Sequence, residues 1–180
     1  MKAIGFKNFR QFQEFPILPI EGVTFLVGEN GAGKSTFTKA CRLLGENMCK
    51  CIKDASPIDY EETKGIFDFL NVCQTLNRAQ CKKAPNGDMS FIVKADYFTI
   101  TYVINNPATS KNLDSRIGDI KSITINDEID DMSWIYDFTK KKIVLKYSGK
   151  LLSHIVSQNI IRQKGIVKIS CAKRMNLLKN

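Results

Sequence analysis

The chain has 180 residues, of which 43% are hydrophobic and 25% are charged, and its formal net charge is +9. This length suits a single domain over residues 1–180, and this composition excludes disordered and fibrous proteins. Because the sequence contains no apolar stretch of about 18 residues and no signal-peptide pattern at its start, we expect a cytoplasmic protein without a membrane span.

The first 27 residues favour β-strands. Residues 2–20 alternate loosely between apolar and polar, which predicts one or two antiparallel strands, and Pro16 and Pro19 limit the second one. Residues 23–27, VTFLV, form a short apolar and β-branched run, as in a strand buried on both faces of a parallel sheet. After residues 28–36, apolar residues recur with helical spacing and predict an amphipathic helix. They are Phe37, Ala40, Cys41 and Leu44, and Gly45 and Asn47 are the expected stop signals.

The rest of the chain predicts further helices and strands. Apolar positions between residues 59 and 82 fit a second helix, and residues 89–105 alternate strongly, as a strand does. We expect more strands at residues 117–125, 142–147 and 165–170, and a helix at residues 149–162. The acidic segment 126–131, NDEIDD, is interpreted as a solvated turn because its carboxylates follow no known metal-loop spacing.

The excess positive charge lies in residues 138–180. Of the 27 lysines and arginines, 11 follow Asp137, the last acidic residue, so the remaining 16 are outnumbered by 18 acidic residues. This basic, acid-free segment is interpreted either as a solvated lysine-rich face or as a surface that contacts DNA. The only histidine, His154, is interpreted as a surface or core residue, and the six cysteines lack zinc-site spacing and are expected to be reduced thiols.

Residues 28–35 match the pattern G-x-x-x-x-G-K-[ST] of a phosphate-binding loop. Its glycines let backbone N–H groups surround a phosphate, and the helix that follows adds the positive end of its dipole. Lys34 is expected on the β- and γ-phosphates as the candidate catalytic residue, Ser35 on Mg²⁺, and Thr36 against the α-phosphate. The pattern therefore predicts a site for ATP and Mg²⁺. The candidate binding residues are Gly28, Glu29, Asn30, Gly31, Ala32, Gly33, Lys34, Ser35 and Thr36.

Hydrolysis needs a second element, an apolar strand that ends in Asp and Glu, which holds Mg²⁺ and activates water. Three segments come nearest to this pattern, and none fits it. Residues 66–68 lie in a helical pattern, residues 122–128 contain Thr124 and Asn126 within the strand, and residues 165–170 have no acid after them. The sequence therefore predicts ATP binding, with weak or absent hydrolysis by this chain alone.

The residues Lys2, Asn8, Phe9 and Arg10, followed by VTFLVGENGAGKST, resemble the start of ABC-type ATPase heads of the RecF and SMC group. Double-strand-break repair ATPases and overcoming-lysogenization-type defence nucleases share this start. The resemblance implies an α/β P-loop NTPase fold, namely an ABC-ATPase-like N-terminal lobe with a mixed sheet and an antiparallel β subdomain. It covers about residues 1–45 closely and implies a P-loop ATPase of the AAA type linked to DNA repair, maintenance or phage defence.

The same resemblance implies roles for individual residues. Arg10 is similar to an arginine near the nucleotide phosphates, Asn30 would lie beside the γ-phosphate, and Gln158 or Gln163 would be the glutamine that senses Mg²⁺. The family's Leu-Ser-Gly-Gly signature is absent, since residues 147–150, YSGK, match it poorly. We therefore expect an incomplete ATPase head, completed by a homodimer or by a partner chain that supplies the C-terminal lobe.

Three alternatives stay open at this point. An ATP-binding subunit of a transporter would stack an aromatic residue on adenine, for which Phe9, Phe12 or Phe15 are available. A small P-loop kinase would suit the length but needs an arginine-rich lid. A non-enzymatic nucleotide-binding or DNA-binding module would use the basic C-terminal segment, and its binding would depend steeply on salt.

Overall fold

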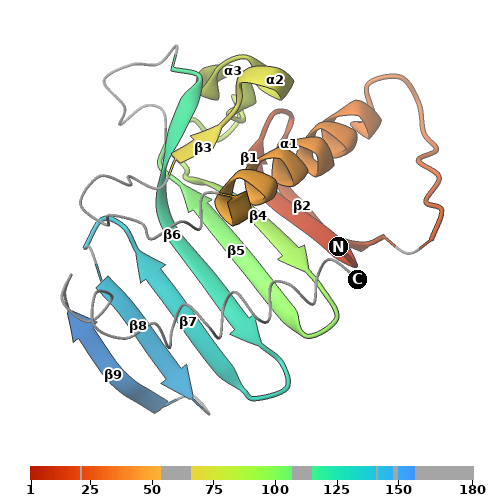
Figure 1. The fold of residues 1–180 in the computed structure, drawn as a ribbon. Coiled ribbons are helices and arrows are strands. Elements are labelled where there is room, and N and C mark those ends of the chain that lie inside the picture. The colour runs from red at the N-terminus through yellow and green to blue at the C-terminus, as the bar shows by residue number, and fades with distance from the viewer. Residues whose placement is uncertain (21, 54–65, 107–114, 141, 148–149, 157–180) are drawn as a thin grey trace.

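The computed structural model describes residues 1–20, 22–53, 66–106, 115–140, 142–147 and 150–156. In this part of the chain, the strands form one nine-stranded sheet with the order β2-β1-β4-β5-β6-β7-β8-β9, and β3 pairs with β6 outside this path (Figure 1). The elements are β1 (Ala3–Phe9), β2 (Phe12–Pro19), α1 (Lys34–Lys53), β3 (Ile66–Asp68), α2 (Leu70–Cys73), α3 (Leu76–Ala79), β4 (Met89–Lys94), β5 (Phe98–Ile104), β6 (Ile117–Asp127), β7 (Met132–Asp137), β8 (Lys142–Tyr147) and β9 (Lys150–Val156).

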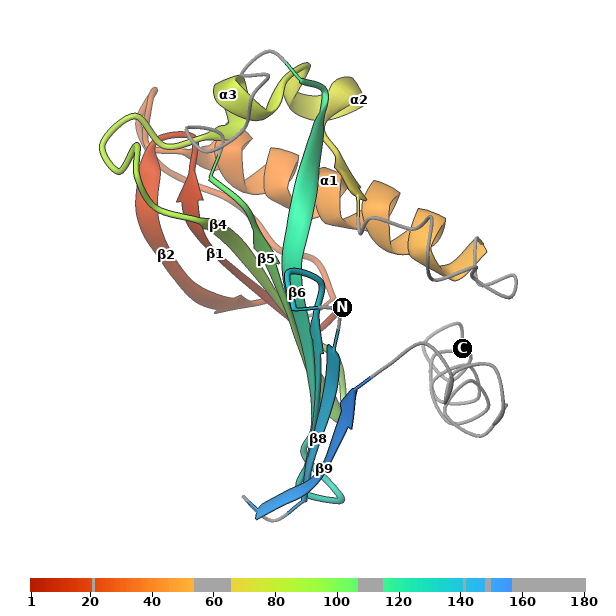
Figure 2. The ribbon, with the colours of Figure 1, turned by 90° about the vertical axis from the view of Figure 1, so that its left-hand side faces the viewer.

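The core lies between helix α1 and one face of the sheet at its β1–β6 end, while β8 and β9 extend away from the helix (Figure 2). Alternate residues of β4 and β5 face this core, as the two-residue period of a strand requires. Phenylalanine rings fill its centre, and those of Phe67 and Phe91 stack with their centroids 5.5 Å apart. The sheet thus gives α1, and the loop before it, a rigid support.

The antiparallel subdomain that the sequence predicts is confirmed, but the mixed sheet is not found among the described strands. Every strand pair there is antiparallel. The strand expected at residues 89–105 is a hairpin of β4 and β5, and the strand expected at residues 117–125 is β6. The acidic segment forms the turn between β6 and β7, where the Asp127 carboxylate accepts the backbone N–H groups of Ile129 and Asp130. Strand β7 was not expected from the sequence.

The buried strand expected at residues 23–27 is wrong for this structure. These residues belong to no strand, and Val23, Phe25 and Val27 are 79%, 83% and 93% exposed. A continuous apolar run becomes a buried strand only where neighbouring strands pair with its edges and other elements cover both of its faces. The described sheet supplies none of these neighbours to residues 23–27.

Two expected helices are also wrong. Within the described residues, β3 and the short helices α2 and α3 replace the helix expected at residues 59–82. The reason is that Phe67 and Phe69, on either side of Asp68, are both buried in the core, as the two-residue period of a strand places them. Gln74, with a φ of 70°, separates α2 from α3. In place of the helix expected at residues 149–162, residues Lys150–Val156 form strand β9, which pairs with β8. Strand β8 confirms the strand expected at residues 142–147. Residues 157–162 lie outside the described part.

Neither Gly45 nor Asn47 ends helix α1 as expected, because the helix continues to Lys53. The Asn47 amide instead joins α1 to β3: it donates to the carbonyls of Leu43 and Asp68, both at 2.9 Å, and accepts the Asp68 N–H at 2.8 Å. The side chain is buried, so these bonds replace hydrogen bonds to water.

Substitution of Asn47 by alanine is expected to lower the free energy of unfolding by about 2 kcal/mol, because it removes three hydrogen bonds in a buried place. Urea unfolding followed by circular dichroism measures the change. Asn71→Ala is the matched control, because Asn71 is exposed and bonds only weakly to Glu46 at 3.3 Å. Equal losses in both variants would contradict the role of Asn47.

Candidate nucleotide-binding site

The glycine-rich loop leads directly into helix α1. Gly31 and Gly33 have φ values of 88° and 100°, a region that favours glycine. The Ala32 N–H donates to the Glu29 carbonyl at 3.2 Å and closes a turn, and the Phe37 N–H donates to the Gly33 carbonyl at 3.0 Å and begins the helical bonding. The loop therefore ends where the free N–H groups of α1 begin, which is the arrangement that attracts an anion.

The tip of the β1–β2 hairpin lies against this loop. Phe9 and Phe12 pair across the hairpin, which leaves Arg10 and Gln11 in the turn. The Gln11 amide donates to the Gly31 carbonyl at 2.9 Å. A Cβ atom at Gly33 would lie 2.3 Å from the Phe12 ring, so only glycine permits this approach. The Arg10 N–H donates to the Ala79 carbonyl at 2.6 Å and fixes the turn to the end of α3.

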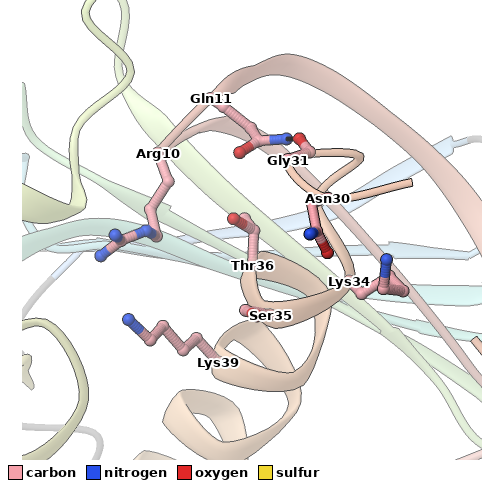
Figure 3. A pocket seen from close by; sticks show the side chains of 9 residues that line it. Arg10, Gln11, Asn30, Gly31, Lys34, Ser35, Thr36 and Lys39 are labelled. Atoms are coloured by element: carbon pink, nitrogen blue, oxygen red, sulfur yellow. Dashed lines mark hydrogen bonds between the residues drawn. The ribbon is translucent and has the colours of Figure 1, made fainter. Parts of the chain in front are cut away.

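The β1–β2 hairpin, the phosphate loop and helix α1 line a cavity of about 250 Å³ that is open to solvent (Figure 3). Seven of the ten predicted site residues line it; only Gly28, Glu29 and Ala32 do not. The carbonyls of Gly28 and Glu29 accept hydrogen bonds from the Lys34 ammonium, the second at 2.7 Å. The seven lining residues from the prediction are Arg10, Asn30, Gly31, Gly33, Lys34, Ser35 and Thr36.

A family model, described as an AAA ATPase domain, matches residues 1–173. The chain belongs to the AAA ATPase domain family. The expected class of P-loop, AAA-type ATPase is thereby confirmed, whereas the closer grouping with RecF and SMC heads remains a prediction. The comparison with curated proteins found no match. None of the described helices of this AAA ATPase domain is long and apolar enough to cross a bilayer.

Two lining residues of the AAA ATPase domain were not predicted, Gln11 and Lys39. The signal for Lys39 was present in the sequence, because it follows Ser35 by four residues and Thr36 by three and so shares their helix face. Gln11 follows Arg10 directly, but only the hairpin geometry shows that its amide reaches the loop. Lys39 lies beyond the motif on the helix that the motif begins, whereas Gln11 lies on a separate hairpin.

The cavity is electropositive. Arg10, Lys34 and Lys39 line it without any carboxylate, and no ion pair within the described residues engages these three cations. The buried Cys73 thiol lies close enough to Arg10 and Lys39 for both cations to act on its pKa. Burial raises the pKa of this thiol, and this effect exceeds the opposing influence of Arg10 and Lys39. Because the thiol therefore stays protonated at neutral pH, it does not neutralise the cations.

The acidic residues at the ends of β3 and β6 do not line the cavity. Asp127 caps the β6–β7 turn, and Glu128 pairs with Lys94 at 3.3 Å and accepts the Thr99 hydroxyl at 2.9 Å. Asp68 ends β3 and accepts the Leu70 N–H. Within the described residues, no group of three His, Cys, Asp or Glu side chains could hold a metal ion. At the cavity itself, Ser35 offers one exposed hydroxyl oxygen.

Several predicted features lie outside the described residues. They are Gln158 and Gln163, the strand at residues 165–170, and most of the basic segment 138–180. The backbone of His154 belongs to β9, but its side chain is outside the description, and residues 148–149 of the poor signature match are outside it as well.

Proposed function

We propose that this AAA ATPase domain binds Mg-ATP in the cavity before helix α1, as the N-terminal lobe of an ATPase head of the RecF and SMC kind. The observation that carries the proposal is that the phosphate-loop residues and Arg10 of the hairpin line the same cavity, which has no acidic residue in its lining. A highly charged triphosphate is the ligand class that such a combination of cations and backbone N–H groups fits.

The side chains around the cavity suggest a division of roles. Lys34 neutralises the β- and γ-phosphates, Thr36 lies against the α-phosphate, and Arg10 adds a planar donor group from the hairpin. Asn30 lies beside the γ-phosphate. The Ser35 hydroxyl fits one position of the octahedral oxygen shell that Mg²⁺ prefers. When bound, Mg²⁺ would neutralise charge on the β- and γ-phosphates.

For hydrolysis, we propose that a C-terminal lobe in the same protein or in a partner chain supplies the missing carboxylates. This proposal rests on the sequence, in which no apolar strand ends in Asp and Glu, and on the exposure of residues 23–27. These apolar and β-branched residues precede the phosphate loop directly and form no strand, so their backbone is available for pairing. A link to DNA, through a dimer of such heads, follows from the resemblance alone.

The structure weakens the reason for the transporter alternative. Of the three aromatic residues available for adenine stacking, Phe9 is wholly buried. Phe12 and Phe15 are partly buried and pack against the core, with their rings 5.9 Å and 4.5 Å from that of Phe6. No observation favours the kinase alternative either.

Isothermal titration tests the proposed function. The chain is expected to bind Mg-ATP and Mg-ADP, and to bind adenosine at least about a hundredfold more weakly, because the phosphates make the charged contacts. Phosphate release is expected to be absent from the isolated chain. Equal affinity for adenosine, or no binding of ATP, would refute nucleotide recognition by the loop. Turnover that depends on Lys34 would refute the proposed need for carboxylates from a C-terminal lobe.

A further inference from the structure

Lys39 lies one helical turn beyond the residues of the phosphate-loop motif, yet it lines the same cavity. It is half-buried on helix α1, and it follows Ser35 by four residues. Figure 3 shows the side chains of Arg10 and Lys39 reaching toward the same space on one side of Thr36, while Lys34 extends in the other direction. The cavity thus has two cationic parts, one at Lys34 and one at Arg10 and Lys39.

The pair formed by Arg10 and Lys39 has no counter-ion within the described residues. The two side chains come from different elements, the β1–β2 hairpin and helix α1, and the bond from the Arg10 N–H to the Ala79 carbonyl fixes the hairpin turn there. Two like charges that converge on a partly enclosed space repel each other, and this repulsion is relieved when an anion lies between them. The Cys73 thiol does not serve as that anion, because burial keeps it protonated.

We propose that Lys39, together with Arg10, contacts the α-phosphate of the bound nucleotide. The site then recognises the α-phosphate as well as the β- and γ-phosphates. The proposal rests on the proposed function, since it assigns the β- and γ-phosphates to Lys34. The α-phosphate is then the next anionic group along the ligand, on the side where Thr36, Arg10 and Lys39 lie. The motif alone assigns no cation to that group.

The test compares Lys39→Gln with the wild type by titration with Mg-ATP, Mg-ADP and tripolyphosphate. Glutamine keeps the length and polarity of the side chain and removes its charge. Affinities for ATP and ADP are expected to fall by the same factor, about tenfold, because one charge-assisted contact to a phosphate common to both is lost. Tripolyphosphate is expected to lose affinity as well. Lys146→Gln, on an exposed position of β8, is the matched control and should change none of these affinities.

Each other outcome overturns the assignment. Unchanged affinities for Lys39→Gln would make Lys39 an ordinary solvated lysine. A loss for ATP without a loss for ADP would place Lys39 at the γ-phosphate. If the wild type itself fails to bind ATP, the proposed function is wrong as a whole. If the wild type binds ATP and Lys39→Gln leaves its affinities unchanged, the proposed function stands and this inference alone is wrong.

Discussion

An alanine in place of Lys34 is expected to weaken ATP binding about a hundredfold or more, the largest loss of affinity for any single substitution in this cavity. The ammonium is the only cation of the motif itself, and it lies over the loop on the carbonyls of Gly28 and Glu29. Contacts from one ammonium to two phosphate groups are worth about 3 kcal/mol, and every 1.4 kcal/mol corresponds to a factor of ten. Titration calorimetry with Mg-ATP measures the loss.

The control for this variant is Lys94→Ala, which removes the same charge from an exposed ion pair with Glu128 on the sheet. Surface pairs of this kind contribute little to stability, so ATP affinity and unfolding should both stay close to the wild type. Thermal unfolding of Lys34→Ala should also match the wild type, because its side chain is not part of the core. An affinity that survives in Lys34→Ala would mean that the loop is not the nucleotide site.

Phe91→Ala is expected to lower the free energy of unfolding by about 3–5 kcal/mol. The Phe91 ring is completely buried at the centre of the core, where it stacks on Phe67 and meets the edge of Phe9 at a centroid distance of 5.2 Å. Alanine would leave a cavity in the core where Phe91 of β4 meets Phe9 of β1 and Phe67 of β3. Denaturant unfolding followed by circular dichroism gives the value.

Phe25→Ala is the matched control, since the same residue type is 83% exposed in the segment before the phosphate loop. Substitutions at such positions usually change stability by no more than about 0.5 kcal/mol. A loss as large as that of Phe91→Ala would show that residues 23–27 are buried in the isolated chain, contrary to the structure described above. The pair of variants therefore tests both the core and the correction to the expected strand.

The sequence was most informative where the information is local. The phosphate-loop residues are contiguous, and their spacing alone places Lys34 and Ser35 at the start of a helix. Alternation likewise predicts the strands of the antiparallel sheet, because one face packs against the core and the other does not. The contribution of the hairpin was predictable only through the family resemblance, which named Arg10 but not Gln11.

The errors arise where pairing partners decide the structure. Residues 150–156 have apolar positions that suit a helix, yet β8 offers a free edge and they become β9. Phe67 and Phe69 fit a helical pattern in the sequence, but their places in the core are set by β6, where a Cβ at Gly118 would come within 3.0 Å of the Phe69 ring. Residues 23–27 were expected to be buried because their composition is typical of a central strand. Composition, however, carries no information on whether neighbouring strands are present to pair with them.

The exposed run VTFLV also determines how the isolated chain should behave in solution. It combines β-branched and aromatic residues with no charge and no proline, which is the composition of segments that self-associate through intermolecular strands. The core around Phe91 does not influence this tendency, because the run is accessible in the folded molecule. We therefore expect self-association of this AAA ATPase domain through the run to increase with protein concentration, even where the fold is fully stable.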